Sequence, residues 1–282
     1  MKVIIVIAVL AANAALAAET VEPWAPRNIS SAKFESHAAF DPLTGDLWFV
    51  RSNPDFSGWR LFVSQCTANG WSVAHPAPIS GDGVEADPWF TPDGRTLWFI
   101  SSRSTDGIKR TDTDIWRVSR NAGGAWGTPE RLPAPVNSEK YEWFPRVAPD
   151  GWLYFGSGQA GGLGKTDIWR AREENGKWVS ENLGPTINTA KNEYEPLPTP
   201  DGKYLIVQTD DSYLRSTRTA TGWSKGENMG TQINANGSEV GATISPSGST
   251  LLFARDTKGE RSGEFFVAHL GPKEDWPPRC PR

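Results

Sequence analysis

The chain has 282 residues, in which 29 lysines and arginines face 33 aspartates and glutamates, for a net charge of −4. A mildly acidic chain without a cluster of basic residues argues against nucleic acid or anionic lipid as its main partner. The length suits either two ordinary domains or one large all-β domain.

The first residues have the pattern of a secretory signal peptide. Lys2 is followed by an apolar run over Val3–Leu10 and by the small residues Ala15-Leu16-Ala17. This pattern predicts a signal peptide at residues 1–17, cleaved before Ala18. The apolar run is short for a membrane span of about 20 residues, and no basic flank follows it. We therefore expect a periplasmic or secreted protein that does not span a membrane.

Five copies of one motif follow. Each copy has a glutamate seven residues before a proline, and three of these prolines open a Pro-Asp-Gly turn. Proline, aspartate and glycine each favour a tight turn, and an apolar alternating run follows it, so every copy should begin with a β-hairpin. The glutamates are Glu35, Glu85, Glu142, Glu193 and Glu239, and the prolines are Pro42, Pro92, Pro149, Pro200 and Pro246.

The rest of each copy predicts two further strands. The third strand is clearest at Asp114-Ile115-Trp116 and Asp167-Ile168-Trp169, and no segment shows a helical rhythm. A period of roughly 45–55 residues with four strands is typical of a β-propeller. We predict that residues 18–282 form one five-bladed propeller of four-stranded antiparallel blades, with repeats starting near 35, 85, 142, 193 and 239. Tryptophans should open the fourth strands, at Trp71, Trp126, Trp178 and Trp223.

A propeller needs a closed ring, because open first and last blades would expose sheet edges. The segment Trp24–Ile29 resembles a fourth strand with nothing before it, so we expect it to complete the last blade. The tail around Trp276 would then reach the first blade, where Cys280 could bond to Cys66; two unpaired thiols are the alternative. No Cys-x-x-Cys pair and no metal-ligand spacing of the histidines is present, so we expect no metal and no cofactor.

The whole pattern of glutamate, Pro-Asp-Gly, Asp-Ile-Trp, Gly-x-Trp and a connector asparagine resembles the exported WD40-like propeller repeat of the TolB type. The second and third copies carry the resemblance best, while the first and last lack Pro-Asp-Gly. The resemblance implies a periplasmic or secreted scaffold that binds proteins or cell-envelope components, and it implies no reaction. TolB has an additional N-terminal α/β domain for which this chain has no room, so its partners are not transferred.

The five repeated glutamates have two interpretations. A structural role, in which each accepts hydrogen bonds from backbone N–H groups or from serine and threonine in the next blade's connector, is favoured because such a role is needed once per blade. Catalysis needs two differentiated carboxylates instead. The alternative function is a small glycosidase or lyase that uses a pair drawn from Asp87, Glu142, Glu193 and Glu195.

Positions that differ between the copies are better candidates for ligand recognition. Two and four residues after the glutamate, the copies carry chemically different side chains on the channel side. We predict a ligand-binding set there, with a solvated channel that holds no ligand as the alternative. Together these features predict a monomeric, non-catalytic protein that binds a protein or an envelope glycan. The predicted binding residues are His37, Asp87, Trp89, Arg146 and Glu195.

Overall fold

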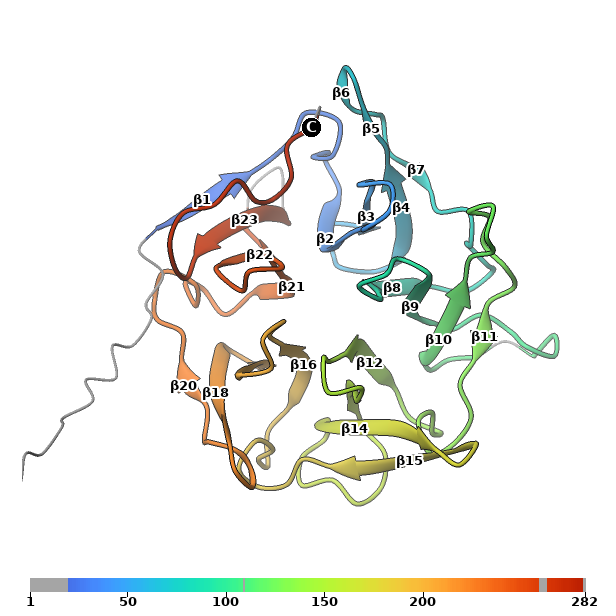
Figure 1. Cartoon of the computed structure of the whole chain (residues 1–282), viewed down its shortest axis with the longest axis vertical. Coiled ribbons are helices and arrows are strands. Elements are labelled where there is room, and N and C mark those ends of the chain that lie inside the picture. Colours follow the sequence, from blue (N-terminus) through green and yellow to red (C-terminus); the bar gives the residue numbers. More distant parts are fainter. Residues whose placement is uncertain (1–19, 109, 259–262, 281–282) are drawn as a thin grey trace, which may run out of the picture.

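The computed structural model describes residues 20–108, 110–258 and 263–280, and these residues contain no helix. Five small antiparallel sheets stand radially around a central axis, which confirms the predicted five-bladed propeller (Figure 1). The predicted signal peptide, residues 1–17, lies outside the described residues. Nothing in the described part of the chain has the length and apolar character of a membrane-crossing helix.

In blades 1 to 4 the strands follow one another outward from the axis in chain order, whereas the outermost strand of blade 5 is the N-terminal β1 (Val21–Trp24). Blade 1 contains β2 (Phe34–Phe40), β3 (Leu47–Ser52), β4 (Arg60–Ser64) and β7 (His75–Pro76), with an outer hairpin of β5 (Cys66–Thr67) and β6 (Gly70–Trp71). Blade 2 contains β8 (Glu85–Phe90), β9 (Thr96–Ser101), β10 (Asp114–Ser119) and β11 (Glu130–Arg131). Blade 3 contains β12 (Glu142–Val147), β13 (Leu153–Ser157), β14 (Asp167–Glu174) and β15 (Lys177–Asn182).

Blades 4 and 5 complete the ring. Blade 4 contains β16 (Glu193–Pro198), β17 (Tyr204–Thr209), β18 (Tyr213–Thr219), β19 (Gly222–Trp223) and β20 (Glu227–Asn228), the last two both paired with β18. Blade 5 contains β21 (Glu239–Ile244), β22 (Thr250–Arg255) and β23 (Glu264–His269), with β1 (Val21–Trp24) as its outer strand.

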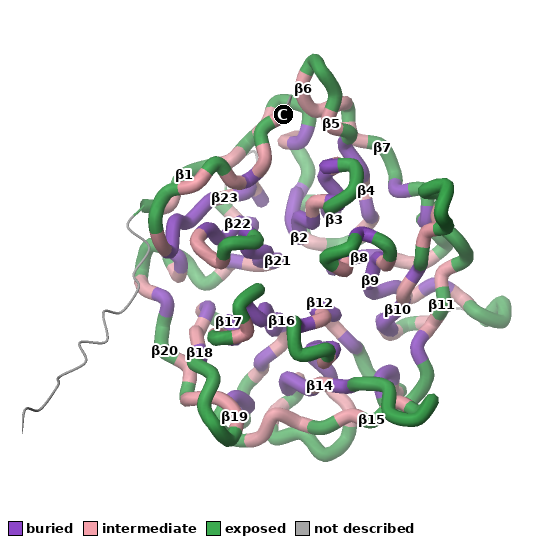
Figure 2. Tube along the Cα trace, viewed as in Figure 1, coloured by how far each residue is buried: buried purple, intermediate pink, exposed green. Residues whose placement is uncertain are grey.

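Apolar side chains fill the wedges between neighbouring blades, and Figure 2 shows the buried residues concentrated on the inner strands. Trp48 of β3, for example, packs edge-on against Phe90 of β8, with ring centroids 5.6 Å apart. Such aromatic contacts bury large apolar areas and favour edge-to-face geometry. The core is thus a set of blade-to-blade interfaces that hold the inner strands in place around the axis.

The fourth strands differ from the prediction in three blades. Trp71 lies in the outer hairpin β5–β6, and Trp126 forms only an isolated bridge with Arg120. The strands that pair with β4 and β10 come later, at His75–Pro76 and Glu130–Arg131, and in blade 4 a second short pairing follows Trp223 at Glu227–Asn228. An outer strand is a sheet edge, where proline and short pairings are tolerated, so sequence pattern constrains it weakly.

The N-terminal strand closes the ring, as predicted, but it starts earlier than expected. β1 pairs antiparallel with β23 and places Trp24 opposite Phe265, whereas Pro26 and Ile29 lie in a following turn. The C-terminal tail crosses to blade 1 and places Trp276 against Phe40, with ring centroids 5.6 Å apart. In the structure Cys66 and Cys280 form a disulfide with Cα atoms 5.4 Å apart.

Candidate functional site

Every innermost strand is irregular just after its glutamate. The pairing register shifts there in all five blades. In four blades the residue two positions after the glutamate has a positive φ: 54° at His37, 56° at Asp87, 50° at Phe144 and 69° at Gly241. A bulge redirects side chains, and a non-glycine residue with positive φ costs free energy that the surrounding structure must supply. At Gly241 a Cβ atom would lie 2.6 Å from the backbone nitrogen of His37, so only glycine fits.

The five repeated glutamates bind the connectors that lead into their own blades, rather than the connector of the next blade as predicted. Glu142, for example, accepts hydrogen bonds from the Ser138 hydroxyl at 2.7 Å and the Ser157 hydroxyl at 2.8 Å, and Glu193 accepts the Thr189 hydroxyl at 2.6 Å. In each blade the residue four positions earlier donates its backbone N–H to the carboxylate. Buried carboxylates need such donors, so this arrangement fixes each connector against the start of its blade. Glu35, Glu85 and Glu239 also pair with Arg51, Arg103 and Arg255.

Beyond the glutamates, four of the predicted binding residues meet at the axis. His37, Asp87, Arg146 and Glu195 are all buried. The Nε2 atom of His37 lies 3.3 Å from Oδ1 of Asp87, whose Oδ2 accepts the backbone N–H of Phe144 at 2.8 Å. These contacts link blades 1, 2 and 3 through one carboxylate.

On the other side of the ring, Glu195 links blade 4 to blade 5. Its Oε2 atom accepts hydrogen bonds from the Tyr213 hydroxyl at 2.9 Å and from the backbone N–H of Gly241 at 3.0 Å. Arg146 is near enough for the charges of both acids to act on it, and its guanidinium carbon lies 5.0 Å from the ring centre of Trp89. The predicted set therefore comes together, and Trp89 contacts it through Arg146.

Burial shifts the pKa values in this cluster strongly. Loss of hydration raises the pKa of Asp87 to about 7, although Arg146 and the Phe144 N–H act in the opposite direction. Burial likewise raises the pKa of Glu195 to about 7. Burial, with a smaller contribution from Arg146, lowers the pKa of His37 to about 3, so this imidazole is neutral at neutral pH.

A raised carboxyl pKa makes stability depend on pH. Asp87 binds its proton more tightly in the folded chain, so its stabilising contribution is present at acidic pH and is lost as pH rises from about 4 through about 7. Asp87→Asn keeps an acceptor for the Phe144 N–H but does not ionise. We expect this variant to gain stability relative to wild type by on the order of 2 kcal/mol between pH 5 and pH 8, measured by urea unfolding. A pH-independent difference between the two proteins would contradict the shift.

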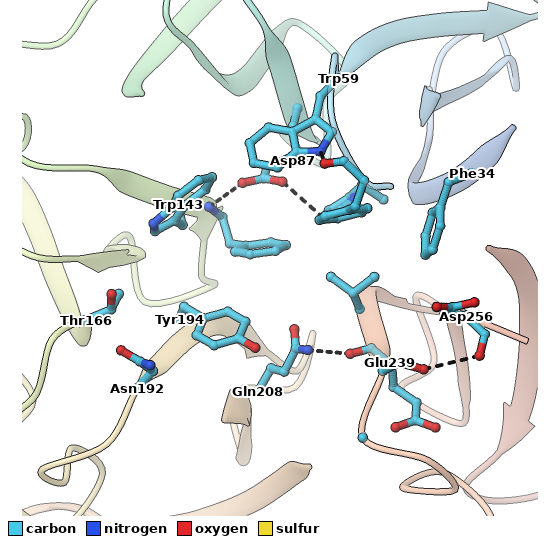
Figure 3. A pocket seen from close by; sticks show the side chains of 17 residues that line it. Phe34, Trp59, Asp87, Trp143, Thr166, Asn192, Tyr194, Gln208, Glu239 and Asp256 are labelled. Carbon is cyan, nitrogen blue, oxygen red and sulfur yellow. Dashed lines mark hydrogen bonds and ion pairs between the residues drawn. The ribbon is translucent and has the colours of Figure 1, made fainter. Parts of the chain in front are cut away.

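A pocket of about 470 Å³ opens where the innermost strands begin, at one end of the axis. We call it the mouth pocket. Aromatic residues form one part of its wall, and polar residues of blades 3, 4 and 5 form the other (Figure 3). The aromatic lining residues are Phe34, Phe56, Trp59, Trp143, Phe144 and Tyr194. The polar ones include Thr166, Asn192, Gln208, Ser238, Glu239 and Asp256.

Only part of the predicted binding set reaches this pocket. His37 and Asp87 line it, whereas Trp89, Arg146 and Glu195 are not among its lining residues. Of the four carboxylates of the catalytic alternative, Asp87 alone lines it. Nowhere in the described residues do three or more histidine, cysteine, aspartate or glutamate side chains gather in a way that could hold a metal ion.

Sequence reasoning missed the aromatic lining. Trp143 and Tyr194 directly follow the repeated glutamates of blades 3 and 4, so the position after the glutamate was a usable signal. Trp59 and Gln208 stand at aligned positions where the other copies carry different residue types, so no repeated residue marked them. Their place in the pocket depends on how the second and third strands of each blade end.

Comparisons with known proteins find similar solved structures only at low sequence identity. No family model and no curated relative matches the chain. The similar solved structures include a protein from Agrobacterium tumefaciens assigned as TolB, with 16% identity, a TM-score of 0.49, and coverage of 80% of this chain and 71% of that one. The chain resembles TolB-type propellers. A luciferin-regenerating enzyme matches at 10% identity and a TM-score of 0.49, with coverage of 89% and 95%.

A prolyl endopeptidase also matches, at 13% identity and a TM-score of 0.42. The match covers 78% of this chain, which spans only 30% of the length of that enzyme. Similarities this low transfer no activity, substrate or partner to the chain, because one fold hosts many unrelated functions.

Proposed function

We propose that the chain is a non-catalytic, monomeric binding propeller of the periplasm or the extracellular space, and that the mouth pocket receives part of a protein or of a cell-envelope glycan. The observation that carries the proposal is the pocket itself, in which aromatic rings face hydrogen-bonding side chains across about 470 Å³. Pockets that hold ligands combine apolar lining with a few directed polar groups in this way. The disulfide and the predicted signal peptide favour export.

The positions of the carboxylates favour binding over hydrolysis. A glycosidase needs two carboxyl groups on opposite sides of one bond in the ligand. Glu142 and Glu193 instead hold connector residues, and Glu195 holds Tyr213 and the backbone of blade 5. Each of these acids therefore already has a structural task.

The test is capture of partners from envelope extract, alongside binding to a glycan array, with variants of the aromatic wall. We expect Trp59→Ala and Trp143→Ala each to weaken binding about tenfold, since a stacked aromatic ring contributes roughly 1 kcal/mol beyond its buried area. The matched control is Trp152→Ala, because Trp152 lies outside the pocket and packs under Arg170 and Arg172. Equal binding by all four proteins, or cleavage of a glycan on the array, would contradict the proposal.

A further inference from the structure

The acids that line the mouth pocket already have partners inside the protein. Burial raises the pKa of Asp87 to about 7, so this carboxyl is about half protonated at neutral pH. Glu239 pairs with Arg255 at 2.8 Å. Asp256 accepts the backbone N–H of Lys258 at 2.7 Å and is not left without a partner. Since the described lining residues include no lysine or arginine, an ion that entered would lose hydration without meeting an unpaired opposite charge, so the pocket favours a neutral ligand.

Gln208 supplies a directed acceptor to this pocket. Its Nε2 atom donates to the backbone carbonyl of Glu239, and because a carbonyl only accepts, this bond fixes the orientation of the amide. The Oε1 atom is then left buried without a hydrogen-bond partner among the described residues, and Gln208 is only 6% exposed. A buried acceptor is destabilising until it meets a donor, so Oε1 favours a ligand that brings an N–H or O–H group.

Tyr194 supplies a donor beside this acceptor. Gln208 pairs in register with Glu195, the residue that follows Tyr194, and Figure 3 shows the Tyr194 hydroxyl directed toward the Gln208 amide. Burial is the largest cause that raises the pKa of Tyr194 to about 12, so the hydroxyl keeps its proton. No hydrogen bond contributes to this shift, and the hydroxyl has no partner among the described residues.

The pair of Tyr194 and Gln208 fits a hydroxyl group of a ligand. A hydroxyl accepts and donates through one oxygen, so it can accept from Tyr194 and donate to Oε1 of Gln208 at the same time. The N–H and C=O groups of a trans peptide are on different atoms and point in opposite directions. A peptide backbone therefore fits this pair less well than a hydroxyl does.

Aromatic rings surround the same space and reach the molecular surface. Trp59 and Trp143, which both line the pocket, meet edge to face with ring centres 5.6 Å apart. Tyr141 stacks on Trp143 at 5.5 Å with the ring planes 7° apart, and Tyr141 is 46% exposed. A pyranose ring has an apolar face of C–H groups and carries its hydroxyls around the edge. Packing that face on aromatic rings removes apolar area from water on both sides.

We propose that the mouth pocket binds a neutral pyranose ring of a glycan, in which one hydroxyl accepts from Tyr194 and donates to Oε1 of Gln208 while the C–H face of the sugar packs on the aromatic wall. The inference rests on the proposed binding function and selects a glycan over a protein as its ligand. The pocket volume of about 470 Å³ is within the range of pockets that hold small ligands.

A glycan array tests the charge of the ligand, with the chain without its predicted signal peptide as the binding protein. The array includes three tetrasaccharides with the same β-1,4-linked backbone: neutral cellotetraose, the cationic chitosan tetramer and the anionic cellouronate tetramer, together with further neutral, amino and acidic envelope glycans. We expect the chain to bind neutral pyranose glycans, and to bind their cationic and anionic counterparts about tenfold more weakly or not at all.

Variants of the two polar groups test the contact itself, by calorimetric titration with the strongest neutral glycan of the array. Tyr194→Phe removes only the hydroxyl and should weaken binding about fivefold, and Gln208→Met removes the acceptor and should weaken it about tenfold. In the double variant the loss should be smaller than the product of the two, because one ligand hydroxyl bonds to both side chains. A thermal melt shows whether each variant folds.

Tyr204→Phe is the matched control. It removes the same hydroxyl from a tyrosine at the other end of β17, where the ring of Tyr204 lies 4.7 Å from the guanidinium carbon of Arg215 and outside the pocket. We expect this variant to change the affinity less than about twofold.

The outcomes separate this inference from the function on which it rests. If the chain binds only amino or acidic glycans, or if both Tyr194→Phe and Gln208→Met bind the neutral glycan as wild type does, the sugar site is wrong and the binding function stands. If no glycan binds but Trp59→Ala loses a protein that wild type captures from envelope extract, the inference is likewise overturned. If neither a glycan nor an envelope protein binds through the aromatic wall, the proposed function itself is removed.

Discussion

Arg146→Met is expected to lower the free energy of unfolding by about 3–5 kcal/mol at pH 8. Arg146 is 1% exposed, and its positive charge lowers the pKa values of Asp87 and Glu195, both of which burial raises. Without the guanidinium, two buried carboxylates would either stay ionised without a cation or take up protons. At pH 5 both are protonated at little cost, so the loss should be smaller there.

Urea unfolding of the variant at both pH values measures the effect. The double variant Arg146→Met with Asp87→Asn should recover part of the loss, because one of the uncompensated acids is then removed. The control is Arg172→Met, since Arg172 pairs with Glu174 on the exposed part of β14 and such pairs contribute little. A loss of unfolding free energy below about 1 kcal/mol at pH 8 would show that the buried acids Asp87 and Glu195 do not depend on this arginine.

Replacing both cysteines with serine is expected to cost about 5 kcal/mol of unfolding free energy, since the disulfide spans a sequence separation of 214. The cross-link restricts the unfolded chain, and the restriction grows with the length of the closed loop. Cys66 lies in the outer hairpin of blade 1 and Cys280 in the C-terminal tail, so the bond joins the two ends of the ring.

Thermal and urea unfolding under oxidising conditions would measure this loss. Wild type treated with a reductant serves as the internal control, and it should unfold at the same temperature and urea concentration as the double variant. Non-reducing mass mapping that finds two free thiols, or a double variant as stable as wild type, would contradict the expectation.

Much of the fold could be predicted because the same spacing between key residues recurs in every copy of the repeat. The spacing between glutamate and proline, such as that from Glu142 to Pro149, fixes the length of an innermost strand and the position of its turn. The outer strands were harder. Pro23 stands inside β1, where it is tolerated only because β1 is an edge, so the sequence pattern favoured the segment after it.

The sequence predicted which residues gather at the candidate site better than it predicted how deeply they are buried. His37, Asp87, Arg146 and Glu195 do converge, because all of them follow a repeated glutamate on the inner strands. Their burial depends on bulges with positive φ at His37 and Asp87, and neither residue type signals that conformation. The aromatic wall depends on strand ends and loops, which vary from blade to blade.

The pairing of β1 with β23 also determines when the molecule can finish folding. The amino-terminal strand β1 pairs only with β23, which spans Glu264–His269 near the other terminus. During synthesis the amino-terminal segment must therefore wait, unpaired, until almost the whole polypeptide has been made. A chain that stops before that strand has four finished blades at most and no way to lock them into a circle.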